Sequence, residues 1–179
     1  GNPAPQAPAA ATKDTLAPSG YTVAFDQDPV NISNETAIGF TFAGAEPGTS
    51  FAYAISSDGG GTPVTGGGTI TTAAEQVTGL DLSGLADGTL TLTVALTDDA
   101  GNTGPDATDT ADKDTVAPAL VIDTPLAGDD VINAAEAPSV TVSGTSTDLP
   151  DGTVVNLAVA DSGAGLVTGT LTGADLLAI

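Results

Sequence analysis

The sequence predicts an all-β chain of tandem antiparallel β-sandwiches of immunoglobulin-like size, and three observations lead to this fold class. The hexapeptide Lys13–Pro18 recurs as Lys113–Pro118 at an offset of 100 residues, with Val116 in place of Leu16 as the single difference. Short segments that alternate apolar and polar side chains lie between the two copies. No stretch has the period of an amphipathic helix. About seven strands in about 100 residues indicate one immunoglobulin-like sandwich.

The first unit contains the clearest strand pattern. Thr89–Thr97 alternates threonine with apolar residues, which predicts one face in the core and one face in water. The glycine-rich stretch between Asp58 and Gly68 predicts a loop or a mobile edge hairpin. The remaining strands are expected over 21–25, 37–42, 51–55, 69–71, 76–80 and 106–112.

The second unit repeats the opening of the first, with strands expected over 119–122, 139–143 and 154–159. Ile179 aligns near Gly79, so the sequence lacks equivalents of the Thr89–Thr97 strand and of the closing strand. The second sandwich is therefore incomplete as given. We favour a truncated sequence over the alternative, in which another chain supplies the missing strands by β-augmentation. The expected domains are a Pro/Ala-rich linker over 1–13, a complete sandwich over 14–113 and an incomplete one over 114–179.

The charge balance excludes several function classes. The chain has 179 residues, with 23 acidic side chains against two lysines, no arginine and no histidine, for a net charge of −21. Two cations cannot form a basic patch, so we expect no binding to nucleic acid. Without histidine or cysteine the chain lacks the usual proton shuttle, thiol nucleophile and zinc ligands, and we expect no enzyme. No apolar run is long enough for membrane insertion.

Several runs of residues resemble a known repeat type. Asp98–Asn102 has the form Asp-x-Ala-Gly-Asn and precedes the last strand and the Lys-Asp-Thr-x-Ala-Pro hexapeptide. Leu80–Thr89 and Ala127–Glu136 are similar to the same repeats. Over residues 13–179 the chain resembles the tandem bacterial Ig-like repeats in the extender regions of very large surface adhesins, including the repeats-in-toxin type exported by type I secretion. The resemblance implies an extracellular spacer at the bacterial cell surface, stiffened by Ca²⁺ at or near the domain junctions.

Carboxylates in the loops are the candidate Ca²⁺ ligands. In a sandwich, the loop before the last strand lies at the end where the first strand begins, so residues 98–102 should lie near Asp14. The exit hexapeptide should be flanked by the loop after the first strand, by Asp81 or Asp87, and by a loop of the second unit. Clustered carboxylates repel one another unless a cation intervenes, and Ca²⁺ takes six to eight oxygen ligands. The candidates are Asp14, Asp98, Asp99 and Asn102 at the entry, and Asp26, Asp28, Asp112, Asp114, Asp148 and Asp151 at the exit.

Three functions follow from these patterns. The first is the Ca²⁺-stiffened spacer, with neighbouring Ig-like repeats of the same polypeptide or an identical chain as partners. The second is a subunit of an extracellular filament or matrix assembled by β-strand complementation between chains. The third is a loop-based ligand-binding module, but Tyr21, Phe51 and Tyr53 fit core positions better than a binding patch. Lys13 and Lys113 are expected to form exposed ion pairs, each worth about 0–1 kcal/mol.

Overall fold

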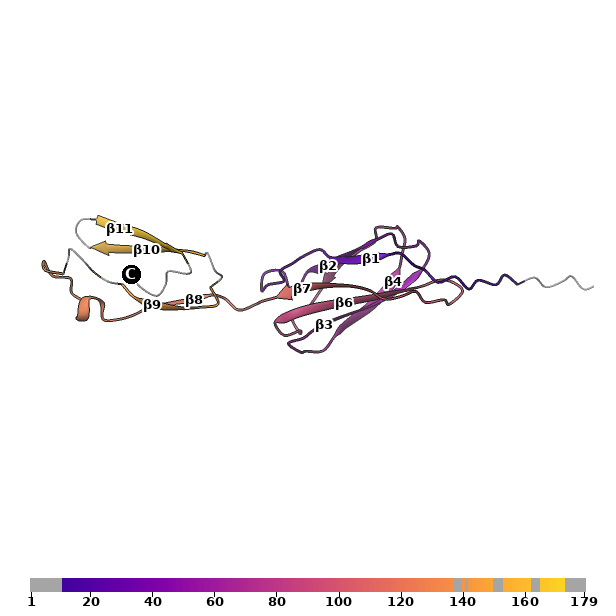
Figure 1. Cartoon of the computed structure of the whole chain (residues 1–179), viewed down its shortest axis with the longest axis horizontal. Helices are drawn as coiled ribbons and strands as arrows, with labels where there is room; N and C mark the ends of the chain where they lie inside the picture. Colours follow the sequence, from indigo (N-terminus) through magenta and orange to yellow (C-terminus); the bar gives the residue numbers. More distant parts are fainter. Residues whose placement is uncertain (1–10, 137–139, 141, 150–152, 162–164, 173–179) are drawn as a thin grey trace, which may run out of the picture. The chain divides into compact units, whose positions relative to one another are not determined.

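The chain folds into two compact units that divide between Thr115 and Val116 (Figure 1). The computed structural model describes residues 11–136, 140, 142–149, 153–161 and 165–172. Within these residues every regular element is a strand, apart from one short 3-10 turn. The predicted all-β fold class is therefore confirmed.

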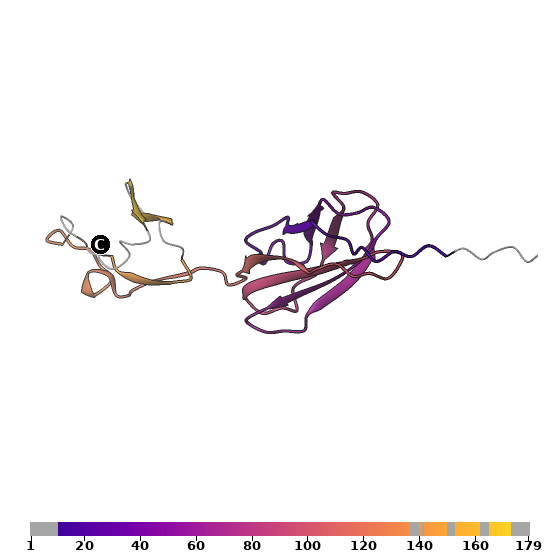
Figure 2. The same cartoon turned by 45° about the vertical axis from the view of Figure 1, so that its right-hand side comes forward.

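The first unit is a sandwich of two antiparallel sheets (Figures 1 and 2). One sheet has the strand order β1-β2-β5 and the other has the order β4-β3-β6-β7. The fourth strand pairs with β3, so it belongs to the sheet that contains the last strand. The strands are β1 Thr22–Phe25, β2 Ile38–Ala43, β3 Ser50–Ser57, β4 Val64–Thr69, β5 Gln76–Leu80, β6 Gly88–Thr97 and β7 Ala107–Lys113.

The threonine-rich strand β6 forms the centre of the core, as its alternation predicts. Leu90, Leu92, Val94 and Leu96 are fully buried, and the threonines between them are half-buried. Each fully buried side chain of this size contributes about 1.5–3 kcal/mol. Across the sandwich, the buried rings of β2 meet rings of β3 edge to face, with centroid distances of 5.3 Å for Phe40–Tyr53 and 5.2 Å for Phe42–Phe51.

The glycine-rich stretch contains a regular strand. Residues 64–69 form β4, which pairs with β3 as a sheet edge, so a loop is the wrong prediction here and the edge hairpin is the right one. Tyr53 lies opposite Gly66 and Phe51 lies opposite Gly68. A Cβ at Gly66 would lie 2.5 Å from the Tyr53 hydroxyl oxygen, so the glycines leave room for these rings. The strand expected over 69–71 is absent, because β4 ends at Thr69.

In the part that the structure describes, the second unit contains two antiparallel pairs of strands. β8 (Ala119–Ile122) pairs with β9 (Gly144–Thr147), and β10 (Val154–Asp161) pairs with β11 (Gly165–Thr172). The turn η1 spans Leu126–Gly128. The expected strand over 139–143 falls partly outside the described residues, and the observed strand begins after it. No helix in the described ranges is long and apolar enough to cross a membrane.

Replacing Gly66 by Ala is expected to lower the stability of the first unit by about 1 kcal/mol, because the new methyl group displaces the Tyr53 ring. Denaturant unfolding followed by tyrosine fluorescence measures this, since both tyrosines of the chain, Tyr21 and Tyr53, lie in the first unit. Gly84→Ala is the matched control, because nothing lies within 4 Å of the position that its Cβ would take. Equal stability of the two variants would contradict the packing of Tyr53 over Gly66.

Candidate functional site

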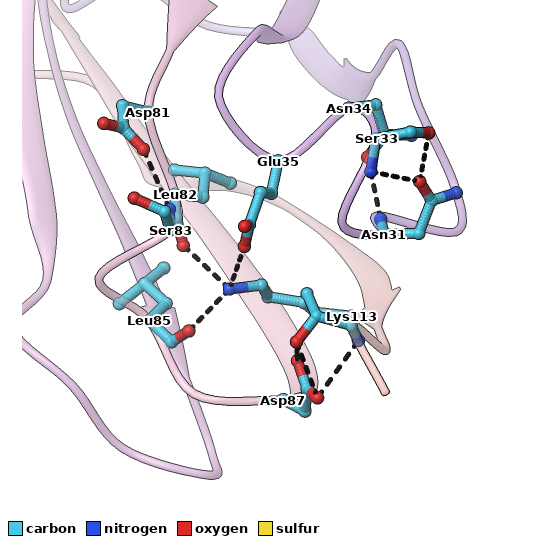
Figure 3. A network of polar contacts seen from close by, with 11 residues as sticks. Asn31, Ser33, Asn34, Glu35, Asp81, Leu82, Ser83, Leu85, Asp87 and Lys113 are labelled. Atoms are coloured by element: carbon cyan, nitrogen blue, oxygen red, sulfur yellow. Dashed lines mark hydrogen bonds and ion pairs between the residues drawn. The ribbon is translucent and has the colours of Figure 1, made fainter. Parts of the chain in front are cut away.

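The end of β7 places a lysine inside the first unit (Figure 3). Lys113 is only 4% exposed, and its Nζ lies 2.9 Å from Oε2 of Glu35. The same Nζ donates hydrogen bonds to the carbonyl oxygens of Leu82 at 3.0 Å and Leu85 at 2.6 Å. A lysine ammonium has three donors, and here each has one acceptor. The prediction of an exposed ion pair is therefore wrong for Lys113, because the alternation of β7 directs Ala111 and Lys113 inward together.

Two connections between strands build the lysine pocket. Glu35 lies between β1 and β2; its N–H donates to the Asn31 carbonyl at 2.9 Å and its carbonyl accepts from Leu82 N–H at 2.8 Å. Leu82 and Leu85 lie between β5 and β6, and both side chains are buried. Their side chains fill the end of the core while their carbonyl oxygens accept from Lys113. The turn over residues 82–85 therefore both packs against the core and binds the lysine ammonium.

Asp81 directly precedes this turn. Its Oδ1 accepts from the N–H of Ser83 at 2.9 Å. Hydrogen bonds from Ser83 lower the pKa of the Asp81 carboxyl, and the Lys113 charge adds a smaller effect in the same direction. Asp81 is thus a turn former beside the lysine pocket.

The buried ion pair couples three segments that are distant in the sequence. Removing ions from water is costly, and the attraction between Lys113 and Glu35 offsets that cost only when both partners are present. Loss of one partner from such a pair costs about 3–5 kcal/mol. The end of β7, the β1–β2 connection and the β5–β6 connection therefore depend on one another.

The two hexapeptides have different environments in the described part of the chain. Lys13 is exposed and precedes β1, whereas Lys113 is the buried last residue of β7. Asp87 binds the third residue of the second copy: its carboxylate accepts from the Thr115 N–H at 3.0 Å and from the Thr115 hydroxyl at 3.0 Å. The first compact unit therefore extends to Thr115, and the beginning of the second hexapeptide belongs to it.

Three of the predicted exit residues lie where the β1–β2 connection meets the end of β7. Asp28 Oδ1 accepts from the Asp112 N–H at 3.0 Å, and the exposed Asp114 donates its N–H to the Val30 carbonyl at 2.9 Å. Asp26 is placed elsewhere, which corrects the expected grouping. Its carboxylate accepts from the Thr41 hydroxyl at 2.7 Å and from the Gln76 side chain at 2.9 Å. Because Asp26 N–H continues the β1–β2 ladder, its side chain lies over that sheet.

At the entry end, the sandwich topology correctly predicts the neighbours of Asp14. The Asn102 side chain donates to the Asp14 carbonyl at 3.4 Å and to Asp98 Oδ2 at 2.8 Å. Asn102 N–H also donates to Asp98 Oδ1 at 2.8 Å. These hydrogen bonds, led by the Asn102 side chain, lower the pKa of the Asp98 carboxyl. Asp99 is exposed in the same loop.

The remaining predicted ligands belong to the second unit. Asp148 is exposed and follows β9 with a φ of +53°. Asp151 lies outside the described residues. Among the residues that the structure describes, no three acidic side chains are gathered in an arrangement ready to hold a metal ion. Sequence reasoning missed Glu35, Leu82 and Leu85 as the partners of Lys113, although the inward position of Lys113 in β7 is visible in the strand alternation.

Trypsin is expected to cleave the native chain after Lys13 and to spare Lys113. These are the only Lys or Arg residues, and Asp and Thr follow both, so each bond is a control for the other. Because cleavage at Lys113 requires local opening, it should be at least about a hundredfold slower. Glu35→Gln should accelerate cleavage at Lys113 about tenfold or more, whereas Glu46→Gln, at an exposed glutamate, should leave it unchanged. Similar native rates at both lysines, measured by mass spectrometry, would contradict the buried pair.

Comparisons with known proteins give similar solved structures only. The sequence matches no family profile and no curated protein. The chain is similar over 88% of its length to the tetra-tandem repeat in the extending region of a large adhesion protein, at 25% identity and a TM-score of 0.42. It is similar over 92% of its length to a 1.5-MDa bacterial ice-binding adhesin, at 21% identity and a TM-score of 0.48. Domains FN1–FN3 of chicken CNTN1 align over 90% of the chain at 12% identity and a TM-score of 0.34. The chain spans 39% of the first of these structures and 54% of the other two.

Proposed function

We propose that the chain is a structural spacer from the extender region of a bacterial cell-surface adhesin, and that Ca²⁺ stiffens its domain junctions. The observation that carries the spacer role is the path of the chain through the first unit. The chain enters beside the Asp98–Asn102 loop and leaves at the opposite end of the sandwich, where β7 ends at Lys113 (Figure 1). Residues 114–118 then lead directly to β8. A unit with its two ends far apart adds its length to the chain.

The surface charge supports the same role. A net charge of −21 keeps a chain soluble and disfavours unspecific association, which suits a long extracellular connection. The only buried charged side chains among the described residues are Lys113 and its partner Glu35. These two side chains pair with each other and stabilise the fold. The described charges therefore favour a structural role over a catalytic one.

The Ca²⁺ part of the proposal rests on the oxygen donors at the two ends of the first unit. Asp28, Asp112 and Asp114 would contribute at the exit, and Asp98, Asp99 and Asn102 with the Asp14 carbonyl would contribute at the entry. Carboxylate, amide and carbonyl oxygens are the ligands that Ca²⁺ takes, and extracellular modules bind it with dissociation constants of about 10⁻⁴–10⁻³ M. The oxygens of Asp98 and Asp28 that accept hydrogen bonds retain further acceptor capacity. A bound cation would reduce the repulsion among these acids.

Millimolar Ca²⁺ is expected to raise the melting temperature and the radius of gyration of the chain, and EDTA to reverse both. Ligand binding to the folded state adds to stability by mass action, and a stiffer junction extends the chain. Thermal unfolding and small-angle X-ray scattering provide the two measurements. The double variant Asp112→Asn with Asp114→Asn should weaken the response at the exit, while Asp106→Asn, at another exposed aspartate, should preserve it. No response in either quantity would remove Ca²⁺ from the proposal and leave the spacer role.

A second candidate function is a filament or matrix subunit that accepts strands from another chain. It is favoured by the apolar residues of β8, since Leu120, Val121 and Ile122 are 45–59% exposed. Sedimentation in Ca²⁺ separates the two functions. The spacer predicts a monomer, and concentration-dependent polymers would favour the filament.

A further inference from the structure

In the first unit, the segment that contains β1 and the segment that contains β7 lie side by side in parallel. β1 contacts β7, although the two strands belong to different sheets. Three hydrogen-bonded pairs share one offset of 84 residues: Tyr21 with Pro105, Phe25 with Asp109, and Asp28 with Asp112. The same offset at three points between Tyr21 and Asp28 means that the two segments run in the same direction.

Backbone pairing completes this parallel contact at the exit end. Val30 forms a parallel bridge with Lys113 and is fully buried. Its N–H donates to the Asp112 carbonyl at 2.8 Å, and its carbonyl accepts from the Asp114 N–H at 2.9 Å. The contact thus extends from Tyr21 at the entry to Val30 at the exit.

Each segment is anchored near the point where the chain enters or leaves the unit. At the entry, the buried Tyr21 hydroxyl donates to the Pro105 carbonyl and accepts from the Leu96 N–H at 3.1 Å. At the exit, the Lys113 ammonium is held by Glu35 and two carbonyl oxygens, as described above (Figure 3). Tyr21 ties the first segment to β6 and to the start of the last segment. Lys113 ties the last segment to the two connections that close the core.

We propose that this parallel contact is a mechanical clamp, which holds the first unit closed when the chain is under tension. The chain enters beside Tyr21 and leaves after Lys113, at opposite ends of the two parallel segments. Tension on the chain therefore pulls the segments in opposite directions along their length. Such shear loads all the hydrogen bonds between them at once, whereas a pull from one end would break them one after another. The two anchors lie where the load enters each segment.

The tension-bearing role rests on the proposed spacer function, because a spacer between a cell and its target transmits force. The clamp itself is a property of the first unit alone. It does not require Ca²⁺ or any particular arrangement of the two units. A failure of the clamp in the experiment below would leave the extended spacer intact, and a failure of the spacer in solution scattering would leave the clamp intact.

Single-molecule pulling in two directions tests the clamp. The chain has no cysteine, so introduced pairs define the attachment points, and all the chosen positions are exposed. Ser19→Cys with Ala117→Cys loads the two segments in shear. Ser19→Cys with Asp106→Cys pulls both segments from the entry end. At the same constant force, the shear pair should unfold at least about tenfold more slowly, since forced unfolding is governed by the unfolding rate.

Equal unfolding rates in the two directions, or faster unfolding in shear, would overturn the clamp. A second comparison uses the shear pair alone and tests the exit anchor. In the shear pair, Glu35→Gln should raise the unfolding rate under force more than Ile70→Val does. The increase in rate is divided, for each variant, by the loss of melting temperature that the variant causes. Ile70 is a fully buried residue outside the two segments. If Ile70→Val accelerates forced unfolding as much as Glu35→Gln, the exit anchor carries no load and the proposal fails.

Discussion

The structure of the first unit depends on one buried positive charge. The Lys113 ammonium lies within a chain of net charge −21, yet it is removed from water and is held by one carboxylate and two carbonyl oxygens. A buried ion is tolerated only where its hydrogen bonds are complete, and no buried polar side-chain atom in the described residues lacks a partner. The last residue of the last strand is therefore buried with its charge satisfied only when the two connections that carry Glu35 and Leu82 are in place.

The same arrangement gives the repeated hexapeptide a physical meaning. In the second copy, the lysine is the last residue of β7 and the following residues lead into β8, so this copy joins the core of the first unit to the first strand of the second. Asp87 fixes Thr115 immediately beyond the buried lysine, which holds the start of the connection against the first unit. Most of the other acids in the described residues lie in loops or at strand ends. The two ends of the first unit therefore carry the anchors of the proposed clamp and the candidate Ca²⁺ ligands.

Local patterns predicted the parts of the fold that depend on strand periodicity. The alternation of Thr89–Thr97 correctly placed four buried side chains, and sandwich topology brought Asn102 to Asp14. Composition misled where a tertiary contact decides the outcome. A run of glycines is typical of loops, but here Gly66 and Gly68 form a strand because the rings of Tyr53 and Phe51 occupy the missing side-chain space. Lysine is normally exposed, and the partners that make burial possible lie 78 and 31 residues away in sequence for Glu35 and Leu82. Asp26 does not join the expected exit group, because the β1–β2 ladder continues one residue past β1 and directs the Asp26 carboxylate over the sheet.

The coupling free energy between Lys113 and Glu35 is the most direct test of this account. A double-mutant cycle with Lys113→Met, Glu35→Gln and the double variant measures it from denaturant unfolding, with tyrosine fluorescence reporting on the first unit alone. If the buried pair closes the sandwich, the double variant should lose less unfolding free energy than the two single variants lose together. The difference should be at least about 2 kcal/mol. A coupling close to zero would show that the two side chains stabilise the unit independently, and it would contradict the central role of the buried charge.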